Sequence, residues 1–521
     1  MAKKILIIFS RRFFYLAALV VAIAIFFQFH LGPWRETLYY DGDNITLALV
    51  LKSIFDGEPF HWVFSSQSFV FPEGPLYLIG FLITQSYRWA LLCSAFFNWI
   101  LLLLGVFLIA RCQSQLRGKS FAVLTIFSSL VLSVLCLELQ PDVNRNTIFS
   151  LIFLQTYYGG VVLITLFQLG ILSVWCVEKR VSKNLGLEFL FIILGGMTYA
   201  SNPLYLLQCL LPLAALASWM ILFEAWRRLG VRLAVLVGIT AAAGQLLRLS
   251  LGQYIKATVG SYVDPMRALD SLSKLLEIIV GSLDHISYLL LWVVWLAIYG
   301  FYFCYCLGKM RQKAWVAMPS AVLIHGFLML APPLIVLGVV VSGNFYTRYF
   351  LAIPIFLLLG ISLAICDSWP GQKRIWFAAT LLLFGTGFFA YQWFTFVAND
   401  SKYERDIECV DHYSQSYKLV AIAGYWNARY LQLYSLGNYS IYQAHKDFHP
   451  YDWLSNIRDH QNSMINSVIV SKTGDQGFIN LQDVKVLGEP FAIYSCTSFD
   501  IYRYEPASIG YQLLNERIRL H

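Results

Sequence analysis

Long apolar segments recur along this chain, and they constrain its fold more than any other feature. A helix that crosses a membrane needs about 20 mostly apolar residues. Eleven candidate segments are found, of which the fifth is short and breaks at Ser201-Asn202-Pro203. They are residues 13–31, 89–110, 121–137, 158–177, 187–200, 203–223, 231–249, 286–307, 316–341, 349–366 and 375–397. We therefore expect an α-helical polytopic membrane protein with about eleven transmembrane helices.

Composition excludes the other broad classes. Of 521 residues, 58% are hydrophobic and 13% are charged, against roughly 45–50% and 25% in average globular chains. So few charges cannot cover the surface of a cytosolic enzyme, and the apolar content excludes a disordered chain.

The distribution of charge predicts the orientation. The connections on one side of the expected membrane, beginning with residues 1–12, hold 18 Lys and Arg but 4 Asp and Glu. Because basic residues favour the cytoplasmic side, the N-terminus is expected inside. An odd number of crossings then puts the C-terminus outside, most simply in the periplasm of a bacterial inner membrane. The net charge of +8 is thus read as an insertion signal rather than a nucleic-acid footprint.

Two regions on the expected outer side are large. One is the first outer loop, residues 32–87, within a transmembrane domain of residues 1–398. The other is a tail of residues 399–521, which alternates β-like runs (418–423, 467–472, 491–496, 500–504) with helix-like stretches (426–433, 451–460). We expect a soluble extracytoplasmic α/β domain ending in a β-hairpin. Cys409 and Cys496 are its two cysteines, and an oxidising compartment favours a disulfide between them.

The strongest candidate for chemistry is the sequence Asp41-Gly42-Asp43 in the first outer loop. Two carboxylates this close can converge on a metal or a sugar hydroxyl, and either can act as a general base. The alternative is an ordinary turn in which Asp43 caps a helix over residues 45–55. That helix is amphipathic and suited to a membrane surface. Glu73 is a third candidate carboxylate in the same loop.

Cations at the outer ends of the segments are candidates for holding a lipid phosphate, because the guanidinium fork of Arg matches phosphate oxygens. Arg348, beside Tyr349, is the first candidate, and its alternative role is an interface anchor. Arg248 and Lys256 are further outer cations, and Asn202 lies in the broken connection after the fifth segment.

Two other groups have simpler explanations. Glu138, Asp142 and Arg145 form a charged cluster after the third segment, for which a solvated loop is favoured. His325 lies in the middle of the ninth segment, where a packing role is favoured.

This pattern resembles the GT-C superfamily of integral membrane glycosyltransferases, which have many spans, an acidic motif in the first outer loop and often a soluble C-terminal domain. The motifs that carry the resemblance are Asp41-Gly42-Asp43, Phe71-Pro72-Glu73, Ser201-Asn202-Pro203-Leu204 and Arg348-Tyr349. The chain lacks the Asp-Glu doublet of protein mannosyltransferases and the Trp-Trp-Asp-Tyr-Gly run of oligosaccharyltransferases. The acceptor and any metal requirement therefore stay open.

The resemblance implies an inverting transfer of a sugar from a polyprenyl-phosphate-linked donor to a glycan, lipid or protein acceptor outside the membrane. An acidic residue of Asp41-Gly42-Asp43 would be the catalytic base. We favour Asp43, with Asp41 in support, because Asp43 directly precedes the amphipathic stretch at residues 45–55. The donor would be held by Arg348 and Tyr349, with Glu73, Asn202, Arg248 and Lys256 as further binding candidates. No cofactor is certain, and a divalent metal is possible. The alternatives are a flippase for lipid-linked sugars, a glycan polymerase or ligase, and a non-catalytic scaffold.

Overall fold

The computed structural model of the chain describes residues 2–113, 116, 118–138, 147–177, 181–256, 264–282, 286–312, 318–395, 401–437, 439–456, 464–473 and 477–519. Asp142 and Arg145 lie outside these residues, as does the second half of the helix expected at 451–460.

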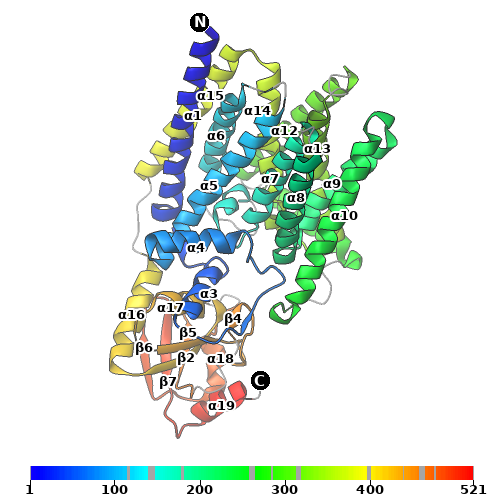
Figure 1. The fold of residues 1–521 in the computed structure, drawn as a ribbon. Coiled ribbons are helices and arrows are strands. Elements are labelled where there is room, and N and C mark those ends of the chain that lie inside the picture. The colour runs from blue at the N-terminus through cyan, green and yellow to red at the C-terminus, as the bar shows by residue number, and fades with distance from the viewer. Residues whose placement is uncertain are drawn as a thin grey trace.

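Ten helices in these described ranges are long and apolar enough to cross a membrane, as expected of a multi-pass membrane protein. They form one bundle, with the N-terminus at one end and the C-terminal domain beyond the other (Figure 1). Their bounds are α1 Ala2–Phe26, α5 Tyr87–Cys112, α6 Ser120–Leu137, α7 Gly159–Val177, α8 Val181–Ser201, α10 Arg227–Ser250, α12 Ile286–Arg311, α13 Pro319–Val341, α14 Ala352–Ser368 and α15 Gly371–Thr395.

The short segment is the sixth of the eleven expected, not the fifth. Helix α8 has 21 residues, whereas the apolar helix after it, which ends in α9 (Leu211–Leu222), covers only Leu206–Leu222. The Arg248 side chain near the end of α10 donates to the carbonyl of Ala200 near the end of α8, at 3.2 Å. Since α8 and α10 end on the same side, the segment between them must return across the bundle.

The first outer loop folds against the end of the bundle. It contains α2 (Arg35–Tyr39), α3 (Thr46–Phe55), the two-residue strand β1 (Trp62–Val63) and α4 (Glu73–Thr84). Helix α3 contacts α4 on one side and the C-terminal domain on the other, and Figure 1 shows it between the two. Its apolar face therefore covers protein rather than a membrane surface.

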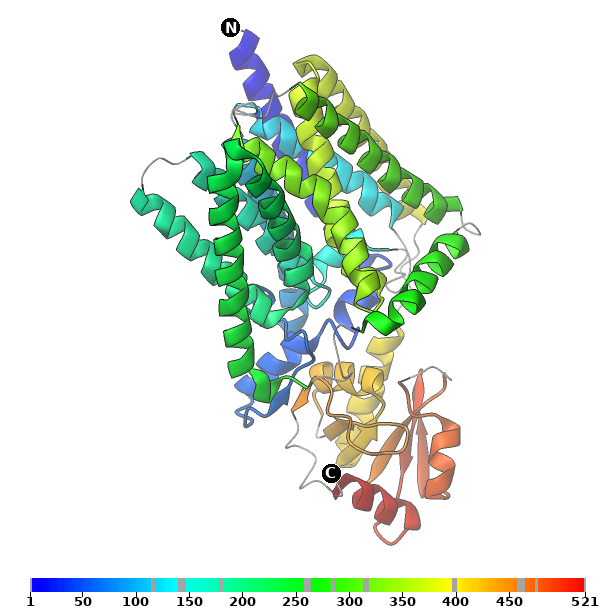
Figure 2. The ribbon, with the colours of Figure 1, turned by 90° about the vertical axis from the view of Figure 1, so that its right-hand side faces the viewer.

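The C-terminal domain contains a five-stranded sheet in the order β3-β2-β5-β7-β6. Strands β3, β2 and β5 are parallel, whereas β7 runs antiparallel to β5 and β6, and β6 and β7 form the hairpin expected from the sequence. The strands are β2 Leu419–Ala423, β3 Tyr439–Gln443, β5 Ser467–Ser471, β6 Ala492–Ser495 and β7 Phe499–Arg503, and the helices are α16 Lys402–Ser416, α17 Tyr425–Tyr434, α18 Leu481–Val484 and α19 Ile509–Arg519. Figure 2 shows this domain below the bundle.

The helix expected at 451–460 is wrong where the structure describes it. Ser455–Asn456 instead forms the short strand β4, which pairs antiparallel with β1 of the first outer loop. The partner strand lies almost 400 residues earlier in the chain, so no local periodicity could have indicated this pairing.

The C-terminal domain is fixed to the first outer loop by polar contacts as well. The Glu404 carboxylate on α16 forms ion pairs with Arg35 of the loop at 2.7 Å and with Arg88 at the start of α5 at 2.8 Å. Within the domain, a disulfide joins Cys409 to Cys496, as the sequence predicts.

Candidate functional site

The acidic turn, Asp41–Asp43, connects α2 to α3. The Asp41 carboxylate accepts a hydrogen bond from the backbone N–H of Asn44 at 3.0 Å. The first residue before α3 is Ile45, and no side chain caps the helix. The expectation that Asp43 caps this helix is therefore wrong: its backbone carbonyl accepts from Thr46, which leaves the carboxylate free to reach across the interface.

A buried arginine of the C-terminal domain holds this turn in place. Arg429 on α17 is 1% exposed, and its Nε donates to the carbonyl of Gly42 at 2.8 Å. Its two other nitrogens donate to the Thr46 hydroxyl and to the carbonyl of Leu454. A Cβ at Gly42 would lie 2.9 Å from the Tyr425 ring and 3.2 Å from the Arg429 side chain. Glycine is thus required here by the close approach of α17.

The Asp43 carboxylate lies between two partners from distant parts of the chain. One oxygen accepts from the Tyr425 hydroxyl at 2.7 Å, and the other lies 3.7 Å from Nη1 of Arg348. Both side chains of the ion pair keep some exposure, 25% for Asp43 and 22% for Arg348. We refer to Asp41, Asp43, Arg348 and Tyr425 as the Asp–Arg cluster.

Tyrosine rings surround the Arg348 guanidinium. Its central carbon lies 4.9 Å from the ring centroid of Tyr346, 5.8 Å from Tyr158 and 5.9 Å from Tyr157. The Tyr349 ring packs edge-on against Tyr158 at 5.4 Å. Nε of Arg348 is buried and has no hydrogen-bond partner among the described residues. Arg348 is therefore held by rings and one carboxylate, and it has donor capacity to spare for an anion.

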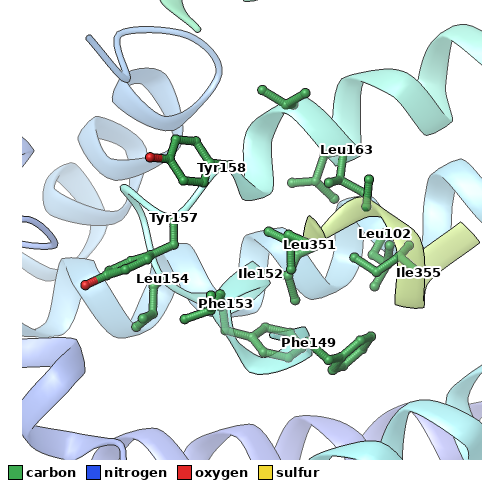
Figure 3. Packing of buried hydrophobic residues seen from close by; sticks show 14 of the residues in the cluster. Leu102, Phe149, Ile152, Phe153, Leu154, Tyr157, Tyr158, Leu163, Leu351 and Ile355 are labelled. Carbon is green, nitrogen blue, oxygen red and sulfur yellow. The ribbon is translucent and has the colours of Figure 1, made fainter. Parts of the chain in front are cut away.

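Tyr157 and Tyr158 reach this place because of the turn that precedes α7. Figure 3 shows both rings projecting from that turn, with their hydroxyl oxygens pointing away from the apolar cluster around Leu351 and Ile355. The Tyr157 hydroxyl lies close enough to the Asp41 carboxylate to lower its pKa, which brings this turn beside the acidic turn.

Burial and, second to it, the neighbouring Asp43 carboxylate together raise the pKa of Asp41 to about 7, against the opposing effects of the Asn44 N–H, the Tyr157 hydroxyl and Arg348. A carboxyl group with this pKa can accept a proton near neutral pH and return it readily, which suits a general base.

Glu73 and Asn202 lie outside the direct contacts of the Asp–Arg cluster. Glu73 is 4% exposed, accepts from the backbone N–H of Gly160 at 3.2 Å, and burial raises its pKa to about 8. It supports the turn that carries Tyr157 and Tyr158. Asn202 is 1% exposed, and its side-chain oxygen accepts from the N–H of Leu204, at the start of the helix that ends in α9.

The other two predicted cations are committed to protein groups. The Arg248 guanidinium donates one hydrogen bond to the carbonyl of Ala200, at 3.2 Å, and one to the carbonyl of Ser66, at 2.9 Å. Lys256 forms an ion pair with Asp452 of the C-terminal domain at 3.2 Å. Both residues connect elements rather than face the Asp–Arg cluster.

Two residues with simpler expected roles can also be placed. Glu138 is buried, contrary to the solvated loop expected, because its carboxylate accepts three backbone N–H groups from residues 148–150. His325 is buried and shares a 2.7 Å hydrogen bond with the Tyr302 hydroxyl, in line with a packing role.

Sequence reasoning missed Tyr157, Tyr158, Tyr425 and Arg429. The pair Tyr157-Tyr158 before two glycines was a usable signal, since it is a polar-tipped aromatic pair at the outer end of a segment. Nothing local marked Tyr425 or Arg429, which lie almost 400 residues from the acidic turn.

The described residues contain no group of three or more His, Cys, Asp and Glu side chains placed to hold a metal ion. The acidic turn offers two carboxylates.

In comparisons with known proteins, no family model, no curated protein and no solved structure matches this chain.

Proposed function

We propose that this protein is a membrane glycosyltransferase that moves a sugar from a polyprenyl-phosphate-linked donor to an acceptor outside the membrane. The observation that supports it best is the Asp–Arg cluster, in which Asp41, with a pKa near 7, neighbours the ion pair of Asp43 with Arg348, an arginine whose Nε has no partner among the described residues. Such a pair supplies the two things that transfer from a phosphate leaving group requires: a base for the acceptor and a cation for the phosphate.

Asp41 is the base in this proposal, in place of Asp43. Asp43 lies between Arg348 and the Tyr425 hydroxyl, so its role is to orient the guanidinium. The acceptor hydroxyl gives its proton to the Asp41 carboxylate while its oxygen forms a bond to the anomeric carbon. The bond from that carbon to the phosphate oxygen breaks, and the electron pair leaves with polyprenyl phosphate. A single displacement of this kind inverts the anomeric centre.

Arg348 stabilises the departing phosphate. Its planar fork matches two phosphate oxygens, and the surrounding rings limit its freedom before the donor arrives. It precedes α14 by a few residues, at the end of the bundle nearest the C-terminal domain, and the proposal requires a lipid-linked donor to approach this end from the bilayer. The charge of the connections favours the outer face of a bacterial inner membrane for this end.

Binding of the leaving group tests the proposal without knowledge of the sugar. Polyprenyl monophosphate is titrated into the full chain in lipid nanodiscs, with polyprenol, which lacks the phosphate, as the matched ligand. We expect the phosphate to bind at least ten times more tightly than the alcohol, and Arg348→Ala to abolish this preference while Arg248→Ala retains it. Equal binding of the two lipids by the wild-type protein would contradict the proposal.

A further inference from the structure

A cavity lies away from the Asp–Arg cluster, where the first outer loop meets the C-terminal domain. It is bounded by α3, the strand pair β1–β4, α17 and β3, and has a volume of about 510 Å³. We call it the interface pocket. Small-molecule sites typically measure roughly 300–1,000 Å³, so a ligand of a few rings fits this space.

Three polar atoms of residues that line the interface pocket are buried and lack hydrogen-bond partners among the described residues. They are Nε1 of Trp62, Oγ of Ser435 and Oγ of Ser455, on side chains that are 5%, 2% and 7% exposed. A buried donor or acceptor without a partner is costly to the folded protein. Three such atoms beside one cavity are unused hydrogen-bonding capacity, and rotation of the two serine side chains would turn their hydroxyls toward a ligand there.

The lining identifies the chemistry of that ligand. Hydroxyl and carboxamide side chains dominate it, and these groups pair with sugar hydroxyls because each can donate and accept. Its charged residues are Lys52, whose ammonium donates to the carbonyl of Gln432 at 2.6 Å, and the two exposed acids Asp56 and Glu58. With its one cation already bonded and two carboxylates nearby, the pocket disfavours phosphate and favours a neutral ligand.

Strand β3 lines one side of the pocket and forms an edge of the sheet, which raises the question of an added peptide strand. Two of its carbonyls are already used: that of Ile441 accepts from the side chain of Gln432, and that of Gln443 accepts from the N–H of Tyr451. An incoming strand would need such carbonyls free. The side chains, rather than the strand edge, are thus the recognition surface.

We propose that the interface pocket binds a neutral oligosaccharide. Helices α3 and α17 both extend from the Asp–Arg cluster to the pocket, since Tyr425 begins α17 and Ser435 follows its last turn. Ten residues of helix span about 15 Å, the reach of a short glycan. That this oligosaccharide is the acceptor rests on the proposed function, whereas its binding does not.

The test uses isothermal titration of the full chain with defined di- to tetrasaccharides of glucose, mannose, galactose and N-acetylglucosamine. We expect at least one of them to bind at millimolar concentration or below. Trp62→Phe, and Ser435→Ala together with Ser455→Ala, should each weaken that binding by roughly three- to tenfold or more, the scale of one or two lost hydrogen bonds. Because the two serine hydroxyls have no protein partner among the described residues, the serine variant should not lower the thermal midpoint.

Ser401→Ala is the matched control, since Ser401 is 4% exposed with an unpartnered Oγ but does not line the pocket. It should leave saccharide affinity unchanged. If none of the saccharides binds the wild-type chain, or if the pocket variants bind as tightly as the control, the proposal is overturned. The wild-type chain could bind a saccharide and yet bind polyprenyl phosphate no better than polyprenol. That result would support this inference and contradict the proposed function.

Discussion

Two regions at the end of the bundle nearest the C-terminal domain each carry an arginine, yet the two arginines make different contacts. Around Arg348, three tyrosine rings and one carboxylate surround the guanidinium, and its Nε keeps no partner in the described part of the chain. At Arg248, two backbone carbonyls accept hydrogen bonds from the guanidinium group. A cation near a membrane surface can thus bind a ligand only where some of its N–H donors have no partner in the protein.

The largest expected effect concerns Asp41, the carboxyl group that neighbours the ion pair of Asp43 with Arg348. Asp41→Asn retains an oxygen for the Asn44 N–H but cannot take a proton, so turnover should fall by about 10²–10⁴-fold. Wild-type turnover should rise with pH up to about 7, as the Asp41 carboxyl loses its proton, and then level off. Because the folded protein holds Asp41 at a raised pKa, ionising it costs stability, and the Asn variant should melt higher than wild type at pH 8.

Steady-state transfer across pH 5–9, with Asp43→Asn alongside, is the measurement. A normal rate in Asp41→Asn combined with a large loss in Asp43→Asn would return the role of base to Asp43.

A smaller effect is expected from Arg348→Lys. Lysine keeps the charge but not the planar fork, and a lost charge-assisted hydrogen bond is worth about 1.5–3 kcal/mol, or roughly 10–100-fold in the rate. Single-turnover rates with saturating acceptor would reveal it. Full activity with lysine would mean that Arg348 serves only as an anchor at the interface.

Arg248→Ala should affect stability instead of chemistry. The substitution removes two hydrogen bonds that join α8 and the first outer loop to α10. We expect the free energy of unfolding to fall by at most about 1.5–3 kcal/mol for each bond. Turnover per folded molecule should stay unchanged. Thermal unfolding in detergent measures the loss of stability, and the activity of the folded fraction measures any effect on turnover. A stable but inactive variant would remove the contrast between the arginines.

The smallest effect is expected for Glu73→Gln. The pKa of Glu73 is raised to about 8 by burial, so the side chain is largely protonated at neutral pH and glutamine resembles it. Between the ordinary carboxyl pKa and about 8, the folded protein holds a proton that the unfolded chain has released, so wild-type stability falls as pH rises through this range. Glutamine should flatten that slope in melting curves and leave turnover at pH 7 unchanged. A large loss of turnover would make Glu73 a reacting group.

The sequence by itself determined the parts whose cause is local. Apolar length identified the membrane-crossing helices, alternation identified the final hairpin, and the Cys409–Cys496 pair followed from the oxidising side expected for its domain. The acidic turn and Arg348 could also be selected as candidates from the sequence, because charges beside an apolar bundle are costly to keep there.

Only the tertiary structure decided which of these charges face one another. Asp43 reaches Tyr425 and Arg348 instead of capping α3, and Arg429 fixes the turn from almost 400 residues away. The pairing of β1 with β4, and the pocket beside it, have the same origin. Such contacts depend on packing between distant segments, which neither composition nor periodicity records, so the availability of a side chain was settled by the fold.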